Sequence, residues 1–204
     1  MSPAQVLERS YVLIKQQLLD GLHAPGQRLE AARLADEIHV SITPVRDVLN
    51  RLTGEGLVRA LAGDGFYVPL MTEQDLRDLL HWNAQLLGCA LRHKARYAGE
   101  HEVPSENEAG HAARTASLFR NIMEQAGNGE CVRAIASAND RLHAIRLGEV
   151  RVLADATAEL DGLERAWSGQ EHSSLRDRLR TYHRRRHSHA ARLLKRAATP
   201  NRDQ

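Results

Sequence analysis

The stretch that decides the fold runs from residue 34 to residue 52 and reads LADEIHVSITPVRDVLNRL. Apolar residues recur in it at three- and four-residue spacing on both sides of residues 39–41, which predicts two helices joined by a tight turn. Thr43 is the expected N-cap of the second helix and Pro44 its first residue, because these residue types favour those places. The residues that this helix is expected to bury are Val45, Val48, Leu49 and Leu52.

A β-hairpin is expected directly after these helices. Residues 57–61 and 66–68 are rich in Leu, Val, Phe and Tyr, and the glycines Gly63 and Gly65 lie between them. Short apolar runs separated by a glycine-containing connection are typical of a hairpin. Two helices with a tight turn, followed by a hairpin, define a winged helix-turn-helix, which we place at residues 1–70.

Residues 71–198 are expected to form an all-helical bundle. Thr72 and Asp75 have the spacing of a capping box, and a stripe of leucines follows them. The sequence therefore predicts a mainly α protein, with a winged helix-turn-helix followed by a helical domain and a boundary near Met71. Further helical runs are expected near residues 111–126, 130–147, 149–167 and 173–197, with a polar break around 99–110 and a frayed tail at 199–204.

The composition of the 204 residues excludes several classes of protein. Hydrophobic residues make up 42% and charged residues 26%, which is typical of a globular chain and argues against disorder. No window approaches the roughly 18 apolar residues that a membrane helix needs, and the N-terminus lacks the pattern of a secretory signal. Cys89 and Cys131 lie far apart, so neither a disulfide scaffold nor a cysteine zinc motif is expected. We expect a cytoplasmic protein.

The sequence carries no recognisable catalytic motif. It has no glycine-rich phosphate loop, no His-Glu-x-x-His motif and no Gly-x-Ser-x-Gly motif. Its aromatic residues are two Trp, four Tyr and two Phe, which argues against an aromatic platform for single-stranded nucleic acid. We therefore expect a protein that is not an enzyme.

The first residues of the second helix are the candidate DNA contacts. In a helix-turn-helix these residues meet base edges in the major groove. Arg46 can pair with guanine through two hydrogen bonds, worth about 1–3 kcal/mol of discrimination. The alternative role of Arg46 is a surface ion pair with Asp47 or Glu55. Around Arg46, the expected DNA-contacting set also includes Ser41, Thr43, Pro44 and Asn50.

This part of the sequence resembles the DNA-binding signature of GntR-family bacterial transcription regulators. The resemblance rests on Ser-x-Thr-Pro-Val-Arg at residues 41–46 and Glu-Gly-Leu-Val at residues 55–58, and it extends over about residues 6–69. The helical remainder is similar to the FadR-like (FCD) effector domain of that family. The resemblance implies a homodimeric regulator, a repressor by expectation, that binds a palindromic operator in double-stranded DNA. It also implies control by a small metabolite bound in the helical domain.

Three positions depart from the pattern of that family. It commonly has arginines where Ile42 and Ala32 stand, and a basic residue where Asp64 stands. The winged domain carries seven Lys and Arg against eight Asp and Glu, so we expect weak nonspecific DNA binding with a shallow dependence on salt. Because Ala32 cannot bind DNA as an arginine does, the neighbouring Arg33 is expected to take over that role. Gly65 completes the expected DNA-contacting set at the wing.

Eleven histidines are a high number for a chain of this length. Asn139 and His143 are four residues apart, as are His183 and His187, so each pair shares a helix face. Two such faces can form a metal site from amide or carboxylate and imidazole groups. FadR-like domains often bind a divalent metal through a similar pattern, so the resemblance implies zinc or a similar ion here. In a competing alignment the later ligands are His172 and His189.

A basic stretch closes the chain. Residues 175–204 hold ten basic and two acidic residues. Such a stretch attracts anions, which fits an organic-acid effector or nearby DNA phosphates. The alternative is a solvated helix face around residues 182–189.

The sequence also leaves open that the protein belongs to a different functional class. That class is a metal-binding helical protein or small metalloenzyme with a vestigial winged domain, favoured by the missing basic residues.

Overall fold

The computed structural model describes residues 2–92 and 110–198, and the chain divides into two compact units, Met1–Met71 and Thr72–Thr199. Each unit has its own hydrophobic core. The tail predicted at 199–204 lies outside the described residues. So does the polar break predicted around 99–110, except for Gly110.

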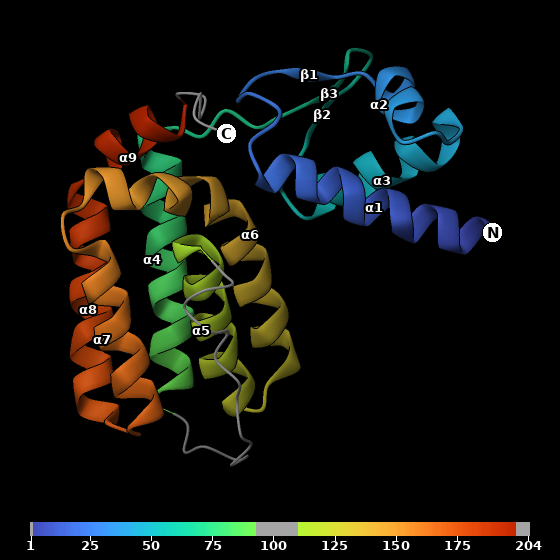
Figure 1. Ribbon diagram of the computed structural model, residues 1–204. Coiled ribbons are helices and arrows are strands. Elements are labelled where there is room, and N and C mark those ends of the chain that lie inside the picture. The colour runs from blue at the N-terminus through green and yellow to red at the C-terminus, as the bar shows by residue number, and fades with distance from the viewer. Residues whose placement is uncertain (1, 93–109, 199–204) are drawn as a thin grey trace. The chain divides into compact units, whose positions relative to one another are not determined.

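The N-terminal unit combines helices with a small antiparallel sheet, whose strands follow the order β1-β3-β2 (Figure 1). The predicted winged helix-turn-helix is confirmed, with α2 and α3 as the helix pair and β2 and β3 as the wing. In chain order its described elements are α1 (Pro3–Leu19), β1 (Arg28–Leu29), α2 (Ala31–Glu37), α3 (Ile42–Gly54), β2 (Arg59–Leu61) and β3 (Gly65–Tyr67).

Helix α3 begins at Ile42, and Ser41 is its N-cap in an extended conformation. The prediction that Thr43 caps this helix is therefore wrong. Thr43 and Pro44 lie within the first turn, where proline fits because the backbone N–H groups there have no partner inside the helix. The turn between α2 and α3 passes through His39, whose φ of 56° is left-handed and reverses the chain tightly.

The inner face of α3 forms the centre of the core of the N-terminal unit. It packs against α1 and α2, and the sheet adds Leu29 from β1 and Phe66 from β3. Burial of one side chain of this kind contributes about 1.5–3 kcal/mol, so this packing fixes the rotation of α3 about its axis. The residues predicted for this face are confirmed as fully buried: Val45, Val48, Leu49 and Leu52.

The second unit is helical throughout its described residues, and Figure 1 shows its long helices packed alongside one another. The mainly α fold class is confirmed. Its core lies between the helices and includes Leu87 of α4, Phe119 of α5 and Leu163 of α7. None of the helices in the described part of the chain is long and apolar enough to cross a membrane. The helices are α4 (Glu73–Ala90), α5 (His111–Gln125), α6 (Gly129–Val152), α7 (Ala156–Ser168), α8 (His172–Ser188) and α9 (Ala190–Ala197).

The start of α4 has the predicted capping box. The Thr72 hydroxyl accepts a hydrogen bond from the Asp75 backbone N–H, and the Asp75 carboxylate accepts one from the Thr72 backbone. Hydrogen bonds from the side chain and backbone of Thr72 also hold the pKa of Asp75 below its ordinary value. The capping box therefore fixes where the helical unit begins.

Two helix boundaries differ from the prediction. Helix α6 continues to Val152, and α7 begins only after Asp155, whose φ of 61° interrupts the helical conformation. The single helix predicted over residues 173–197 is broken at His189 into α8 and α9. No glycine or proline marks this break, so periodicity alone predicts one continuous helix.

Candidate functional site

The outer face of α3 carries the residues that the sequence predicts to contact DNA. Ile42, Arg46 and Asn50 are four residues apart and form one stripe along the helix. Because the opposite face is fixed in the core, this stripe is held toward solvent. The exposed residues of the predicted set are Ser41, Thr43, Arg46 and Asn50, while Pro44 is half-buried.

Arg46 makes no ion pair with another residue of the described ranges 2–92 and 110–198. The alternative pair with Glu55 is not formed, because Glu55 has other partners. Its Oε1 lies 3.3 Å from Arg51 Nε, and its Oε2 lies 3.1 Å from Lys15 Nζ. The exposed guanidinium of Arg46 is therefore available to an acceptor outside the protein.

A groove of about 310 Å³ lies between the start of α3 and the wing. Ile42 and Arg46 line it from α3, Gly65 lines it from β3, and Arg28 lines it from β1. Two guanidinium groups thus share one hollow, with Glu30 as an acidic residue in its lining. The structure brings Arg46 and Gly65 of the predicted set together in this groove.

Arg28 is a candidate DNA contact that the sequence analysis missed. Its Nη2 donates to the backbone oxygen of Asp64 at 2.8 Å, which places a guanidinium at the turn of the wing. Asp64 stands where the GntR-family pattern commonly has a basic residue. Arg28 supplies a positive charge at that place from β1. Strand alternation was the available signal, because a buried Leu29 requires its neighbour to point to the other face.

The face of the sheet that carries Arg28 has a second arginine. Arg28 in β1 and Arg59 in β2 both lie opposite Tyr67 in β3. Directly opposed residues of antiparallel strands point to the same side, so these three side chains form one row. The Tyr67 hydroxyl donates to Asp64 Oδ2 at 2.8 Å, and this hydrogen bond raises the pKa of Tyr67. The sheet therefore presents two cations, Arg28 from β1 and Arg59 from the wing, although the turn of the wing carries an aspartate.

Arg33 lies on α2 but outside the lining of the α3 groove. Its Nε lies 2.9 Å from Glu37 Oε1, and it lines a separate hollow together with His23. Ala32 is the residue of α2 that lines the groove. That Arg33 contacts DNA in place of an arginine at position 32 stays a prediction. Arg28, by contrast, lines the groove.

The first pair of predicted metal ligands lies on α6. Both polar atoms of the Asn139 amide have partners, because its Nδ2 donates to the backbone oxygen of Ala116 at 3.0 Å and its Oδ1 accepts from Arg146 Nη1 at 2.9 Å. His143 is half-buried one turn further along the helix. A guanidinium thus already donates to the Asn139 oxygen, and its positive charge disfavours a metal ion there.

The second predicted pair lies on α8, with its two imidazoles in different surroundings. His183 is buried, and its Nδ1 lies 2.8 Å from the backbone oxygen of Leu179. His187 is exposed, and its Nδ1 accepts from Arg77 Nη1 at 2.9 Å. The two histidines therefore do not converge on one point.

The ring of His183 is neutral at ordinary pH, because burial lowers its pKa to about 4. A neutral ring that donates from Nδ1 to Leu179 must accept at Nε2. The side-chain oxygen of Asn83 lies 2.9 Å from Nε2, and Asn83 Nδ2 has no partner among the described residues. Exchange of the oxygen and nitrogen of this amide supplies the required donor, and we assign the amide in that orientation.

The alternative ligands are also engaged or distant from a common point. His172 is exposed at the start of α8, and His189 Nδ1 donates to the backbone oxygen of Arg185 at 2.8 Å. Within residues 2–92 and 110–198, no group of three or more His, Cys, Asp and Glu side chains is placed to hold a metal ion. A divalent cation therefore does not fit these residues as the fold arranges them.

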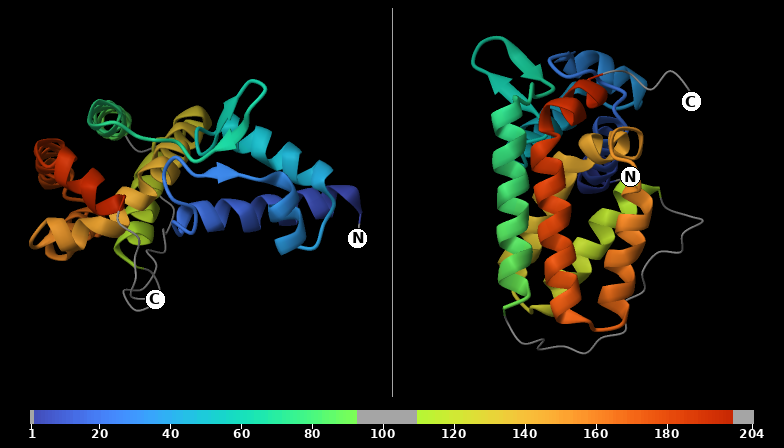
Figure 2. Two further views of the ribbon diagram at one scale, coloured as in Figure 1. Left: turned by 90° about the horizontal axis from the view of Figure 1, so that it is seen from above. Right: turned by 90° about the vertical axis from the view of Figure 1, so that its left-hand side faces the viewer.

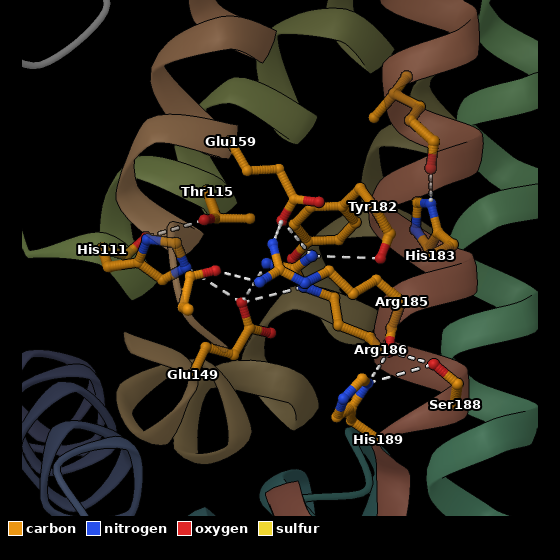
Figure 3. A network of polar contacts seen from close by, with 12 residues as sticks. His111, Thr115, Glu149, Glu159, Tyr182, His183, Arg185, Arg186, Ser188 and His189 are labelled. Atoms are coloured by element: carbon orange, nitrogen blue, oxygen red, sulfur yellow. Dashed lines mark hydrogen bonds and ion pairs between the residues drawn. The ribbon is translucent and has the colours of Figure 1, made fainter. Parts of the chain in front are cut away.

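The interior of the helical unit instead contains an ion-pair network that links four helices (Figure 3). Arg186 of α8 donates to Glu149 Oε2 of α6 from Nη2 at 2.7 Å and from Nε at 3.0 Å. Its Nη1 donates to Glu159 Oε2 of α7 at 2.6 Å. At the start of α5, His111 Nε2 lies 3.0 Å from Glu149 Oε2. The guanidinium of α8 thus joins α6 and α7 directly, and Glu149 extends the network to α5.

Burial and charge act against each other in this network. Arg186 is 0% exposed and Glu149 is 1% exposed. Burial alone raises the pKa of Glu149, but the hydrogen bond from His111 and the charge of Arg186 outweigh it, so the pKa lies below its ordinary value. Burial lowers the pKa of Arg186 while Tyr182 and Glu149 raise it, and the net shift is upward. The pair is therefore ionised.

The basic segment around residues 182–189 is only partly a solvated face. Arg184 and His187 are exposed, as that alternative predicted. The prediction of a solvated helix face is wrong for Tyr182, His183 and Arg186, which are buried. The guanidinium carbon of Arg186 lies 3.3 Å from the centre of the Tyr182 ring, so the aromatic face also stabilises the buried charge.

The fold and the exposed face of α3 define a two-part protein in which a winged helix-turn-helix is followed by a helical bundle. Residues 8–68 match the family model of bacterial regulatory proteins of the gntR family. The N-terminal unit is therefore similar over most of its length to the regulatory proteins of that family. The helical unit lies outside the matched residues.

Two curated relatives are similar over the same part of the chain. The Nta operon transcriptional regulator of Aminobacter aminovorans is 37% identical over 79 residues, which are 39% of this chain and 38% of that protein. The HTH-type transcriptional regulator McbR of Escherichia coli is 32% identical over 80 residues, 38% of this chain and 36% of that protein. The matches thus span less than two fifths of these relatives.

Solved structures resemble nearly the whole chain at low identity. A GntR transcriptional regulator from Rhodococcus sp. RHA1 superposes with a TM-score of 0.78 and 14% identity, covering 92% of this chain and 98% of that one. The E. coli McbR/YncC structure gives a TM-score of 0.63 and 16% identity, covering 94% of this chain and 99% of that one. Such similarity shows that both units have a fold found together in known structures.

Proposed function

We propose that this protein is a sequence-specific DNA-binding transcription regulator, a repressor, whose helical unit senses a small organic acid. The observation that carries the proposal is the exposed guanidinium of Arg46 at the start of α3, with no ion-pair partner in the described ranges, in a groove that it shares with Arg28. An arginine in this place on a recognition helix suits the bidentate acceptor edge of guanine. The curated relatives named above are described as transcriptional regulators, which supports the same class.

We also propose that the protein acts as a homodimer on a palindromic operator. One recognition helix covers too few base pairs for specificity in a genome, and two-fold pairing doubles the site. The helical unit is the natural place for dimer contacts and for the effector, in the manner of a FadR-like domain. The ten basic residues of the segment 175–204 support an anionic effector. A metalloenzyme is not favoured, because the predicted ligands do not converge.

Replacement of Arg46 by alanine tests the proposed recognition. We expect operator binding to weaken about tenfold to a hundredfold, which corresponds to the roughly 1–3 kcal/mol of one bidentate base contact. Nonspecific binding is expected to change little. DNA fragments from the region upstream of the gene, selected by their binding to the full chain, supply the operator. Fluorescence anisotropy at fixed salt measures the affinity.

Arg9→Ala is the matched control for that experiment, because Arg9 is an exposed arginine on α1. It is expected to leave operator affinity within about twofold, since a surface substitution away from the DNA-contacting face has only a small effect. Equal losses in both variants would show that charge alone, and not the position of Arg46, matters. The regulator proposal fails if the protein binds none of the DNA fragments even at low salt.

Arg28→Ala and Arg59→Ala test the phosphate contacts of the wing. Each is expected to reduce the slope of log affinity against log salt by about one, because each removes one phosphate contact and its released counterion. Affinity should fall by a similar factor on specific and on unrelated DNA. Titration of anisotropy over a range of salt measures the slope. A slope identical to that of the unmodified protein would place these arginines away from DNA.

A further inference from the structure

A groove of about 380 Å³ lies on the helical unit between α4 and α8. The right-hand view of Figure 2 shows these two helices side by side, α4 in green and α8 in orange-red. Leu87 and Leu91 line the groove at the C-terminal end of α4, and Leu179 lines it from α8. Its volume falls in the range of about 300–1,000 Å³ that small-molecule sites occupy. None of the predicted metal ligands except His183 belongs to its lining.

The charged residues that line this groove are all arginines. Arg92 lies two residues beyond the end of α4, and Arg176 and Arg180 belong to α8. Within the described residues, Arg92 and Arg176 form no ion pair. Arg180 Nη1 lies 3.2 Å from Asp177 Oδ1, and both side chains are more than two-thirds exposed, so water screens that pair. The groove therefore offers positive charge beside apolar surface.

Gly88 lines the groove from α4. A Cβ atom at this position would meet only Arg92 Nη1 within 4 Å, at 3.7 Å. Packing inside the described unit therefore does not require a glycine here. Glycine inside a helix is destabilising relative to alanine, and here it leaves one position of the groove lining without a side chain.

We propose that the α4–α8 groove binds an amphipathic carboxylate. The anionic head lies between Arg176 and Arg92, and an apolar body of a few carbon atoms lies against Leu87, Leu91 and Leu179. This inference rests on the proposed function, in which the helical unit senses an organic acid, and it assigns the place and chemistry of that ligand. The site is separate from the buried ion-pair network around Arg186.

Isothermal titration of the full chain with straight-chain carboxylates, from butanoate to octanoate, tests the site. Affinity is expected to rise by up to about fourfold for each added methylene that is buried. The alcohol of matching length is expected to bind at least about tenfold more weakly, because it lacks the charge that the guanidinium groups attract. A single site per chain is expected.

Three variants connect the binding to this groove. Arg176→Gln is expected to weaken octanoate binding about tenfold, since it removes one charge-assisted hydrogen bond. Gly88→Leu is expected to abolish binding while it preserves the helix, because leucine favours helix and its side chain fills the groove. Arg178→Gln is the matched control and is expected to bind octanoate normally. Arg178 lies on the other side of α8, with its Nε 3.2 Å from Ser174 Oγ.

Operator binding, measured on the same protein samples by fluorescence anisotropy, separates failure of the groove site from failure of the proposed function. If no carboxylate of the series binds while the operator is still bound, the groove inference is wrong and the regulator proposal stands. If carboxylates bind but no DNA is bound, the regulator proposal is wrong. Normal octanoate binding by Gly88→Leu and Arg176→Gln, or equal weakening by Arg178→Gln, also overturns the groove assignment.

Discussion

Replacing Arg186 with methionine is expected to lower the free energy of unfolding of the helical unit by about 3–5 kcal/mol. Methionine keeps an unbranched apolar side chain but removes the guanidinium that binds Glu149 and Glu159. Glu149 is 1% exposed, so no water replaces the missing donors. The cost thus arises because Glu149 is left buried with His111 but without the guanidinium, and because Glu159 loses its donor at 2.6 Å.

Urea unfolding followed by tryptophan fluorescence measures this effect in the full chain. Both tryptophans of the sequence, Trp82 in α4 and Trp167 in α7, belong to the helical unit. Their fluorescence therefore follows the unfolding of that unit and is not dominated by the winged domain. The midpoint and slope of the transition give the change in unfolding free energy.

Two further variants distinguish the buried pair from a general effect of losing an arginine. Arg184→Met changes an exposed arginine of the same helix and is expected to cost less than about 0.5 kcal/mol. The double variant Arg186→Met with Glu149→Met is expected to recover part of the stability, since it removes both charges of the buried pair but leaves Glu159 without its donor from Arg186. A cost for Arg186→Met as small as that for Arg184→Met would contradict the structural role of the network.

Acid is expected to destabilise the helical unit through His183. Desolvation by burial is the main cause that lowers the pKa of this ring to about 4 in the folded protein, from 6.5 in the unfolded chain. The unfolded state therefore binds the proton first as the pH falls. The stability contributed by the neutral ring is complete above pH 6.5 and is lost as the pH falls toward 4, by at most about 3 kcal/mol.

Comparison with His183→Gln isolates this contribution. Glutamine cannot titrate, so the loss of unfolding free energy between pH 7 and pH 4 is expected to be smaller by up to about 3 kcal/mol in this variant. Glu149 adds its own loss, because the stability from its lowered pKa is complete above the unfolded value of 4.5 and is lost as the pH falls from there toward the lower folded pKa. That loss occurs in both proteins and cancels in the difference.

The exposed His172 on the same helix provides the control for the acid experiment. His172→Gln is expected to leave the pH dependence of unfolding as it is in the unmodified protein. Urea transitions recorded at intervals between pH 7 and pH 4 provide both curves. If His183→Gln and the unmodified protein lose stability in parallel, His183 is not held neutral by its surroundings.

The candidate DNA-binding face could be predicted because local pattern determines it. The apolar spacing of α3 selects which side enters the core, and the exposure of Arg46 and Asn50 follows from the same spacing. The buried residues of α3 were predicted correctly although its N-cap was not, because a shift of the N-cap by two residues does not change the spacing of the apolar residues. The position of Arg28 could not be found in this way, since its bond to Asp64 depends on pairing across the sheet.

The groups inside the helical unit could not be placed from local pattern. The ion-pair network joins residues of α5, α6, α7 and α8, and its contacts span from His111 to Arg186. Four-residue spacing correctly places His183 and His187 on neighbouring turns, but it does not tell which of them turns inward. The same limitation applies to the groove, whose arginines come from two helices that are distant in the chain.

The amino-acid sequence by itself determined the two-part architecture, the helix pair with its wing, and the face of α3 that meets solvent. These follow from periodicity and turn chemistry, which act between residues a few positions apart. Only the tertiary structure decided that Arg186 is a buried cross-link, that Arg28 stands at the wing, and that three arginines share a groove. Such pairings are selected by packing and by the cost of leaving a charge without a partner, and both depend on segments that meet only in the folded chain.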